Sequence, residues 1–242
     1  MASIAANYEP SDADIPYEEE LLRNPYSVKL WIRYLKHKRD AKPAVRNFLY
    51  ERALRKVPGS FKLWFRYLSE RREQVKHLRI DDRRYEDVNN AHERALITLH
   101  KMPRIWMDYV DFLVFQKRVT KTRHVCDRSL RALPATQHEM VWKKYISFVE
   151  GPHVPKETGV RVFRRYMKFD AQDVERFIDY LVAREKNDEA IKLLVETLDN
   201  SEFVSKRGKK KHALWTQLCE IIAKHPQEAK GVKVDAVLRT GL

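Results

Sequence analysis

Apolar residues recur along the chain in a short pattern: a tryptophan, two residues, a tyrosine and then an aliphatic residue. The clear copies are Trp31–Tyr34–Leu35, Trp64–Tyr67–Leu68, Trp106–Tyr109–Val110 and Trp142–Tyr145–Ile146, and the weaker ones are Phe177–Tyr180–Leu181 and Trp215–Leu218–Cys219. Successive anchors (31, 64, 106, 142, 177, 215) lie 33, 42, 36, 35 and 38 residues apart. Because positions i, i+3 and i+4 share one helix face, the pattern predicts repeated amphipathic helices, each with a narrow apolar stripe that needs a neighbour.

A second pattern follows each anchor and supplies that neighbouring helix. It reads Tyr-Glu-Arg-Ala-Leu over residues 50–54, His-Glu-Arg-Ala-Leu over 92–96 and Cys-Asp-Arg-Ser-Leu over 126–130, with degenerate copies at 163–167 and 194–198. A small residue in this pattern lets two helix axes approach closely, so that a large tryptophan packs against it. We therefore expect the repeat core to comprise Trp31, Tyr34, Ala53, Trp64, Tyr67, Ala95, Trp106, Tyr109, Trp142, Tyr145, Phe177, Tyr180 and Trp215.

Capping residues divide the chain into helix pairs. Ser27 and Ser60 each precede a tryptophan by four residues, where a helix N-cap is expected. Prolines 58, 103 and 134 fall between units, and prolines 43 and 155 fit the first turn of a second helix. The predicted pairs cover roughly 27–57, 60–101, 103–133, 137–168, 171–198 and the chain from 210 onward. The predicted fold is therefore all-α, an α-solenoid of stacked antiparallel helix pairs.

The organisation along the chain follows from these pairs. We expect an acidic N-terminal tail with a short capping helix over 1–24, five repeats over 25–198, a basic loop over 199–211 and the start of a sixth, truncated repeat over 212–242. Pro16 is expected to open the capping helix, which carries Tyr17, Leu21 and Leu22 over the first repeat. The anchor spacing of 42 residues after Trp64 exceeds the other spacings, and the extra residues lie between Glu70 and Asn89. They are interpreted as either an overlong first helix or an ordered loop. Residues 234–238 resemble a further second helix without a polar cap, which predicts a fragment of a longer array.

Charge is unevenly distributed. The chain has 48 Lys+Arg and 34 Asp+Glu, a formal net charge of +14, but residues 1–24 hold six acids and one base, or −5, so the remainder carries +14 − (−5) = +19. Such a body attracts polyanions or acidic protein surfaces, although cations also serve simply to solvate a surface. The candidate partner or RNA contacts are Arg71, Arg72, Lys76, Arg79, Arg83, Arg84, Lys206, Arg207, Lys209, Lys210 and Lys211.

Three interpretations of these cations stay open: contact with acidic proteins, direct RNA contact, or a basic surface that is merely solvated or acts as a nuclear-import signal. Proteins that bind single strands use exposed aromatic residues for stacking, whereas here the repeat core accounts for the tryptophans and their tyrosines. This observation favours acidic proteins over RNA.

Sequence signals of catalysis are missing. The six glycines never form a phosphate-binding loop, and the nine histidines include no His-Glu-x-x-His pattern. Cys126 and Cys219 lack the paired spacing of a zinc site and are expected to be structural thiols. Asp81 and Asp82 lie among arginines and are expected to be solvated. We therefore expect no catalytic residue, cofactor or metal ion, and we find no apolar stretch of the ~18 residues that a membrane span needs.

The two patterns together resemble the HAT (half-a-TPR) repeat, with Trp-x-x-Tyr at 64–67 and Glu-Arg-Ala-Leu at 51–54. Longer strings resemble the Syf-one/XPA-binding protein family of pre-mRNA-splicing factors: residues 16–20, 23–28, 85–90, 100–104 and 131–134. The resemblance is collinear over essentially the whole chain, whose relatives are several times longer. Repeats four and five depart from it, at Arg164–Met167 and Phe177.

The resemblance implies a nuclear, non-catalytic scaffold subunit of the spliceosome associated with the nineteen complex. Its implied partners are other spliceosomal proteins, with a secondary link to transcription-coupled DNA repair through XPA.

Overall fold

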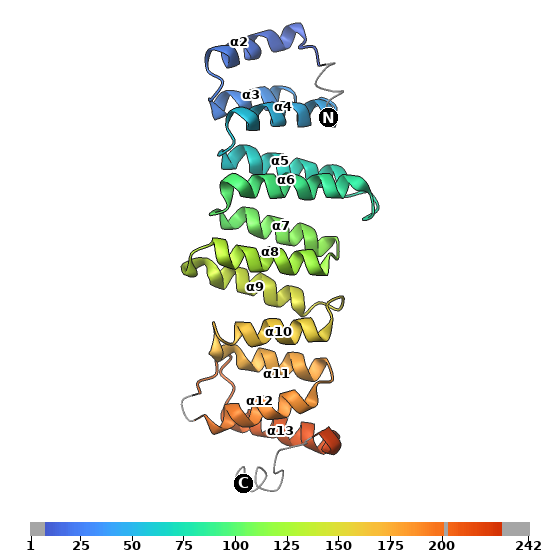
Figure 1. Cartoon of the computed structure of the whole chain (residues 1–242), viewed down its shortest axis with the longest axis vertical. Coiled ribbons are helices and arrows are strands. Elements are labelled where there is room, and N and C mark those ends of the chain that lie inside the picture. The colour runs from blue at the N-terminus through green and yellow to red at the C-terminus, as the bar shows by residue number, and fades with distance from the viewer. Residues whose placement is uncertain (1–7, 201–202, 229–242) are drawn as a thin grey trace. The chain divides into compact units, whose positions relative to one another are not determined.

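The computed structural model describes residues 8–200 and 203–228, and all regular secondary structure within these ranges is helical. The chain divides into an N-terminal unit, 1–141, and a C-terminal unit, 142–242. The α-helices are α2 (Ile15–Arg23), α3 (Val28–His37), α4 (Pro43–Lys56), α5 (Phe61–Val75), α6 (Arg83–Leu99), α7 (Pro103–Phe115), α8 (Val119–Ala132), α9 (His138–Val149), α10 (Lys156–Tyr166), α11 (Val174–Ala183), α12 (Asn187–Asp199) and α13 (Lys211–Lys224) (Figure 1). The expected all-α solenoid class is confirmed.

Local signals explain where these helices begin. The Ser27 hydroxyl accepts a hydrogen bond from the Leu30 amide at 3.5 Å, and Ser60 accepts one from Leu63 at 3.4 Å, so each serine caps a first helix. Pro43 occupies the first turn of α4, where its missing N–H costs nothing.

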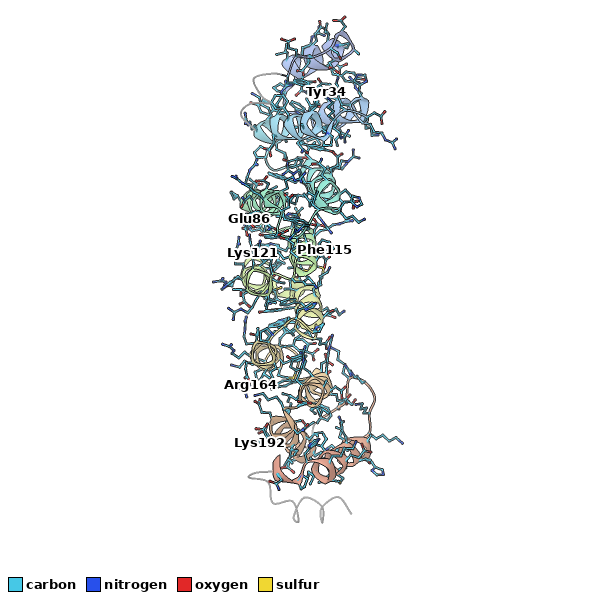
Figure 2. The ribbon with its side chains drawn as sticks, turned by 90° about the vertical axis from the view of Figure 1, so that its right-hand side faces the viewer. Tyr34, Glu86, Phe115, Lys121, Arg164 and Lys192 are labelled. Carbon is cyan, nitrogen blue, oxygen red and sulfur yellow. The ribbon has the colours of Figure 1, made fainter. Side chains whose placement is uncertain are left out.

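In the N-terminal unit the helices form two layers. Figure 2 shows Glu86 of α6 and Lys121 of α8, both on second helices, on one side of this unit, and Phe115 of α7, a first helix, on the other. The tryptophans lie between the layers: Trp31, Trp64 and Trp106 are 2%, 3% and 2% exposed. Each indole N–H donates to the carbonyl six residues earlier, at 2.7–2.8 Å, which fixes the turn that enters the helix.

Most of the other expected core residues are also buried. Ala53 and Ala95 are fully buried, as are Tyr34, Tyr67, Tyr109 and Tyr145, while Trp142, Phe177 and Tyr180 are 4–6% exposed. Trp215 is only half-buried and packs against the edge of the core cluster, so it joins the expected core only in part. The apolar stripe of α13 instead consists of Leu214, Leu218, Ile221 and Ile222, which pack against α11 and α12.

The surplus length of the second repeat is shared between its two helices. α5 continues to Val75 and α6 starts at Arg83, which leaves only a short connection over 76–82. The extended part is packed, because Val75, Tyr85 and Val88 bury their side chains together with Phe112. An overlong helix and an ordered connection are therefore both present.

The acidic segment contains the short helix α2, with Pro16 in its first turn. Leu21 is buried, and the Tyr17 ring stacks on Tyr34 with centroids 5.3 Å apart. The expectation that Leu22 also covers the first repeat is wrong, because Leu22 is 83% exposed on the outer side of the helix. The helix expected over 234–238 lies outside the described residues.

Candidate interaction surface

A repeated hydrogen-bonded link joins neighbouring repeats of the N-terminal unit. Glu51 of α4 accepts a hydrogen bond from the Tyr67 hydroxyl of α5 at 2.7 Å and two from the Arg94 guanidinium of α6, at 2.9 and 2.6 Å. Burial alone would raise the pKa of Glu51, but the hydrogen bonds from Arg94 and Tyr67 outweigh it and lower the pKa. We call this arrangement the Glu-Tyr-Arg link.

The next repeat contains a second copy of the link. Glu93 of α6 accepts hydrogen bonds from the Tyr109 hydroxyl at 3.1 Å and from Arg128 of α8 at 2.9 Å. In both copies one acid on a second helix binds the following first helix and the following second helix. Three helices are thereby held in register by one carboxylate.

The helix α2 supplies a third copy. Glu18 accepts a hydrogen bond from Tyr34 at 3.1 Å and two from Arg52 at 2.7 and 2.8 Å, and the Arg52 guanidinium lowers the pKa of this carboxyl group. Tyr17 and Glu18 precede Tyr50 and Glu51 by 33 residues, and the Tyr50 ring packs against Tyr67 with centroids 5.2 Å apart, as the Tyr17 ring does against Tyr34 at 5.3 Å. In structure, α2 is therefore the second helix of a degenerate repeat.

The arginines of the link also cover the core tryptophans. The guanidinium carbons of Arg52, Arg94 and Arg128 lie 5.7, 5.6 and 5.4 Å from the ring centroids of the tryptophans in their own repeats. A cation over an aromatic face is attracted by the ring quadrupole. The recurring arginine is thus a structural residue of the repeat, although the Arg94 and Arg128 side chains remain 48% and 42% exposed.

Paired amides form a second recurring link. Asn47 and Gln74 exchange two side-chain hydrogen bonds at 2.9 and 3.1 Å, and Asn89 and Gln116 exchange two at 3.0 Å. The two residues of each pair are 27 positions apart. The first pair joins α4 to α5, and the second joins α6 to the residue that caps the C-terminal end of α7. The equal spacing was visible in the sequence, but polar amides carry no apolar periodicity that would single them out.

In the C-terminal unit the link is interrupted. Arg164 occupies the glutamate position of the pattern and binds Glu189 at 2.7 Å. Because a guanidinium has only donors, it offers no acceptor to a tyrosine. The Tyr180 hydroxyl instead donates to the Lys156 carbonyl at 3.4 Å. The departure from the repeat consensus at Arg164 therefore changes the contact between α10 and α11.

The cations predicted in the second repeat do not form one free patch. Arg71 is buried, 8% exposed, and lies over the Tyr67 ring, so its assignment as a contact is wrong. Arg72 pairs with Asp108, which also faces His92. The other members remain on the surface: Lys76 lies 3.5 Å from Glu73, Arg79 pairs with Asp81 at 3.0 Å, Arg84 pairs with Asp82 at 2.8 Å, and Arg83 is exposed.

The predicted basic run at 206–211 folds back on acidic residues of the same unit. Lys206 pairs with Asp170, while Arg207 reaches Asp179 at 2.9 Å and Lys209 lies 3.8 Å from it. The Lys211 ammonium donates to the Asn200 carbonyl at 2.8 Å, and Lys210 is exposed. Much of the charge of this run is therefore engaged within the chain.

A further concentration of positive charge lies in a groove of about 670 Å³ between α3, α4 and α5. We call it the α3–α5 groove. Its cations are Lys36, Arg39, Arg46 and Arg66, and its apolar part includes Leu35, Tyr50 and Phe65. The sequence analysis missed the groove, because these cations come from three helices and no motif joins them.

Two further hollows are lined mainly by second helices. One of about 590 Å³ includes Lys121 and Arg128, which bind Glu86 and Glu93. The other, of about 330 Å³ in the C-terminal unit, includes Arg164 and Lys192, which Figure 2 shows on the same side of that unit. Its lining also contains Glu189 and Glu196, so it has no excess of positive charge.

Neither a membrane-spanning helix nor a metal-binding group occurs in the described part of the chain. No helix there is long and apolar enough to cross a membrane. No group of three or more His, Cys, Asp or Glu side chains there is arranged to hold a metal ion. Cys126 is buried, and burial raises the pKa of its thiol.

Comparisons of the sequence with known proteins identify relatives that contain helical repeats of the HAT type. The family described as pre-mRNA-splicing factor Syf1/CNRKL1 N-terminal HAT repeat matches residues 13–172, and the pre-mRNA-splicing factor SYF1 middle HAT repeat matches 174–242. The chain is 50% identical to a pre-mRNA-splicing factor syf1 homolog of Drosophila melanogaster over 95% of its own length and 26% of the relative. It is 48% identical to human pre-mRNA-splicing factor SYF1 over 96% and 27%, respectively.

A more distant relative matches the same part of the chain. Pre-mRNA-splicing factor cwf3 of Schizosaccharomyces pombe is 36% identical over 95% of this chain and 29% of the relative. The chain thus spans about a quarter of the length of these curated relatives. The matched residues contain the tryptophan anchors and the three copies of the Glu-Tyr-Arg link described above. Since the first family match alone covers more than half of the chain, the chain belongs to the SYF1 family of HAT-repeat pre-mRNA-splicing factors.

Proposed function

We propose that the chain is part of a non-catalytic scaffold that organises protein partners in nuclear pre-mRNA splicing. The observation that carries this proposal is the family membership, because relatives at 36–50% identity are named pre-mRNA-splicing factors. As the chain spans about a quarter of those relatives, their role is extended to it by this proposal.

The hydrogen bonds between neighbouring helices support a scaffold function. Three copies of the Glu-Tyr-Arg link and two amide pairs hold successive helices in register, so the outer faces keep fixed spacings. Stacked repeats of this kind present extended surfaces on which several weak contacts act together. The partners we propose are protein subunits of the nineteen complex, with XPA and transcription-coupled repair factors as a secondary group.

Direct RNA binding is the competing function, and one experiment separates the two. The immobilised chain is incubated with nuclear extract at low and high salt, with and without RNase, and recovered proteins are identified by mass spectrometry. An unrelated helical-repeat protein of similar net charge serves as the control. We expect nineteen-complex subunits to be enriched over the control and to resist RNase. Recovery that disappears with RNase, or that equals the control, would contradict the scaffold proposal.

A further inference from the structure

The α3–α5 groove is walled by three consecutive helices of the N-terminal unit. Arg46 of α4 holds the walls together, since its guanidinium donates to the Leu35 and Lys38 carbonyls at the end of α3, at 3.0 and 2.8 Å, and binds Glu70 of α5. The Tyr50 hydroxyl also donates to Glu70 at 3.0 Å. The groove is therefore pre-formed and does not depend on a ligand to order its sides.

The groove has a positive net charge, and some of its cations form no ion pair with described residues of the chain. Four cations and one carboxylate line it, a balance of 4 − 1 = +3, and the carboxylate, Glu70, is already satisfied by Arg46 and Tyr50. Lys36, Arg39 and Arg66 are exposed, and none of them forms an ion pair within the part of the chain that the structure describes. These three side chains are available to an incoming anion.

The apolar part of the groove discriminates between classes of anion. Phe65 is half-buried, with the Arg104 guanidinium 4.6 Å from its ring centroid and the Phe61 ring 5.6 Å away. A nucleobase that stacked on Phe65 would have to displace one of these neighbours, whereas the edge of the ring and the Leu35 side chain still provide apolar lining. Cations around an apolar base suit a peptide that carries both carboxylates and apolar side chains.

We propose that the α3–α5 groove binds an acidic segment of a partner protein, with its carboxylates on Lys36, Arg39 and Arg66 and an apolar side chain against Phe65. This inference rests on the proposed scaffold function and deepens it by naming the chemistry of one partner. The volume of about 670 Å³ accommodates a few residues of such a segment, so the groove acts as one of several contact points.

The experiment uses the 242-residue chain and a fluorescein-labelled peptide of four Glu-Asp-Leu repeats, with binding followed by fluorescence anisotropy at low salt. The test variant neutralises the three available cations, K36Q/R39Q/R66Q. The matched control neutralises three exposed cations outside the groove, R55Q/K56Q/K62Q, and so has the same net charge. We expect Kd to rise by about tenfold for the test variant and by less than about twofold for the control, because three exposed ion pairs are lost only in the first.

Two further probes test the apolar contact with Phe65 and the alternative that the groove binds nucleic acid. A peptide of Glu-Asp-Gly repeats should bind several-fold more weakly than the Glu-Asp-Leu peptide, because it brings no apolar side chain to Phe65. A twelve-nucleotide oligouridylate should bind the test variant and the matched control with equal affinity. The thermal midpoint of the test variant is expected to match that of the wild-type chain, since its three side chains are exposed.

The outcomes separate this inference from the proposed function. Equal peptide affinity for the test variant and the control would overturn the groove assignment, as would loss of oligouridylate binding without loss of peptide binding. If the wild-type chain and the test variant recover the same spliceosomal subunits from nuclear extract, the scaffold function stands and the groove is not where those subunits bind. If the wild-type chain recovers none, the scaffold function fails whatever the peptide result.

Discussion

The Glu-Tyr-Arg link makes a graded prediction, because its three copies share one chemistry and differ in burial. The carboxylate side chains of Glu51, Glu18 and Glu93 are 8%, 19% and 34% exposed. Glutamine in place of each glutamate keeps the size of the side chain and removes the charge. We expect the free energy of unfolding to fall most for Glu51→Gln, less for Glu18→Gln and least for Glu93→Gln, because water replaces a lost hydrogen bond more easily at an exposed site.

The magnitude follows from the contacts of Glu51. A buried hydrogen bond to a charged group contributes about 1.5–3 kcal/mol, and the Tyr67 hydroxyl bond at 2.7 Å is of this kind. The Arg94 side chain is 48% exposed, so its ion pair is screened and contributes at most about 1 kcal/mol. Since glutamine retains one acceptor oxygen, we expect a loss of about 2–3 kcal/mol for Glu51→Gln and at most about 1 kcal/mol for Glu93→Gln.

Urea unfolding followed by far-ultraviolet circular dichroism measures this series, with the slope m checked between variants so that the midpoint reports stability. Glu73→Gln is the matched control, because Glu73 is 71% exposed and only 3.5 Å from Lys76, and its effect should stay within about 0.5 kcal/mol. Equal losses at Glu51, Glu18 and Glu93 would refute the argument from burial. A loss at Glu51 no larger than that of the control would refute the link itself.

Three further predictions test other features. Trp64→Ala should cost about 3–5 kcal/mol in denaturant melts, because it empties a buried site, and a loss below about 1 kcal/mol would remove Trp64 from the core. A thiol reagent added to the folded chain should label Cys219, which is partly exposed, and leave Cys126 unmodified until urea unfolds the chain; labelling of both at equal rates would show that Cys126 is not buried. Because the pKa values of Glu18 and Glu51 are lowered on folding, their stabilisation is complete above the ordinary value of 4.5 and is lost as pH falls through the folded values. Urea midpoints should therefore drop below pH 4.5, and the variant with glutamine at both positions should drop less; parallel curves would contradict this.

The helices themselves were predictable, because apolar periodicity and capping residues act over a few residues. Burial of Arg71 was also predictable in principle, since it lies seven residues after Trp64 and therefore on the same stripe as Tyr67 and Leu68. Its charge suggested exposure, but the period of the helix determined its position. At Trp215, an aliphatic stripe one residue out of register with the anchor pattern decided which side faces the core.

The interaction surface was much less predictable, because it depends on which charges meet after folding. Arg207 and Asp179 are 28 residues apart, and nothing local indicates that they pair. The Glu-Tyr-Arg link needs three helices in place before Glu51 finds Arg94, 43 residues later. The Glu-Arg-Ala-Leu pattern did contain the acid and the base, but their partners lie in the neighbouring repeats.

The helix α2 has a practical consequence for protein engineering. It presents Tyr17 and Glu18 to the first complete repeat, and it carries Glu20, which pairs with Arg33 of α3, at the position that Ala53 and Ala95 occupy in α4 and α6. Residues 11–23 are thus a transplantable segment: grafted ahead of a synthetic array whose opening repeat offers a tyrosine and an arginine at matching places, they should dock on that repeat through the same hydrogen bonds.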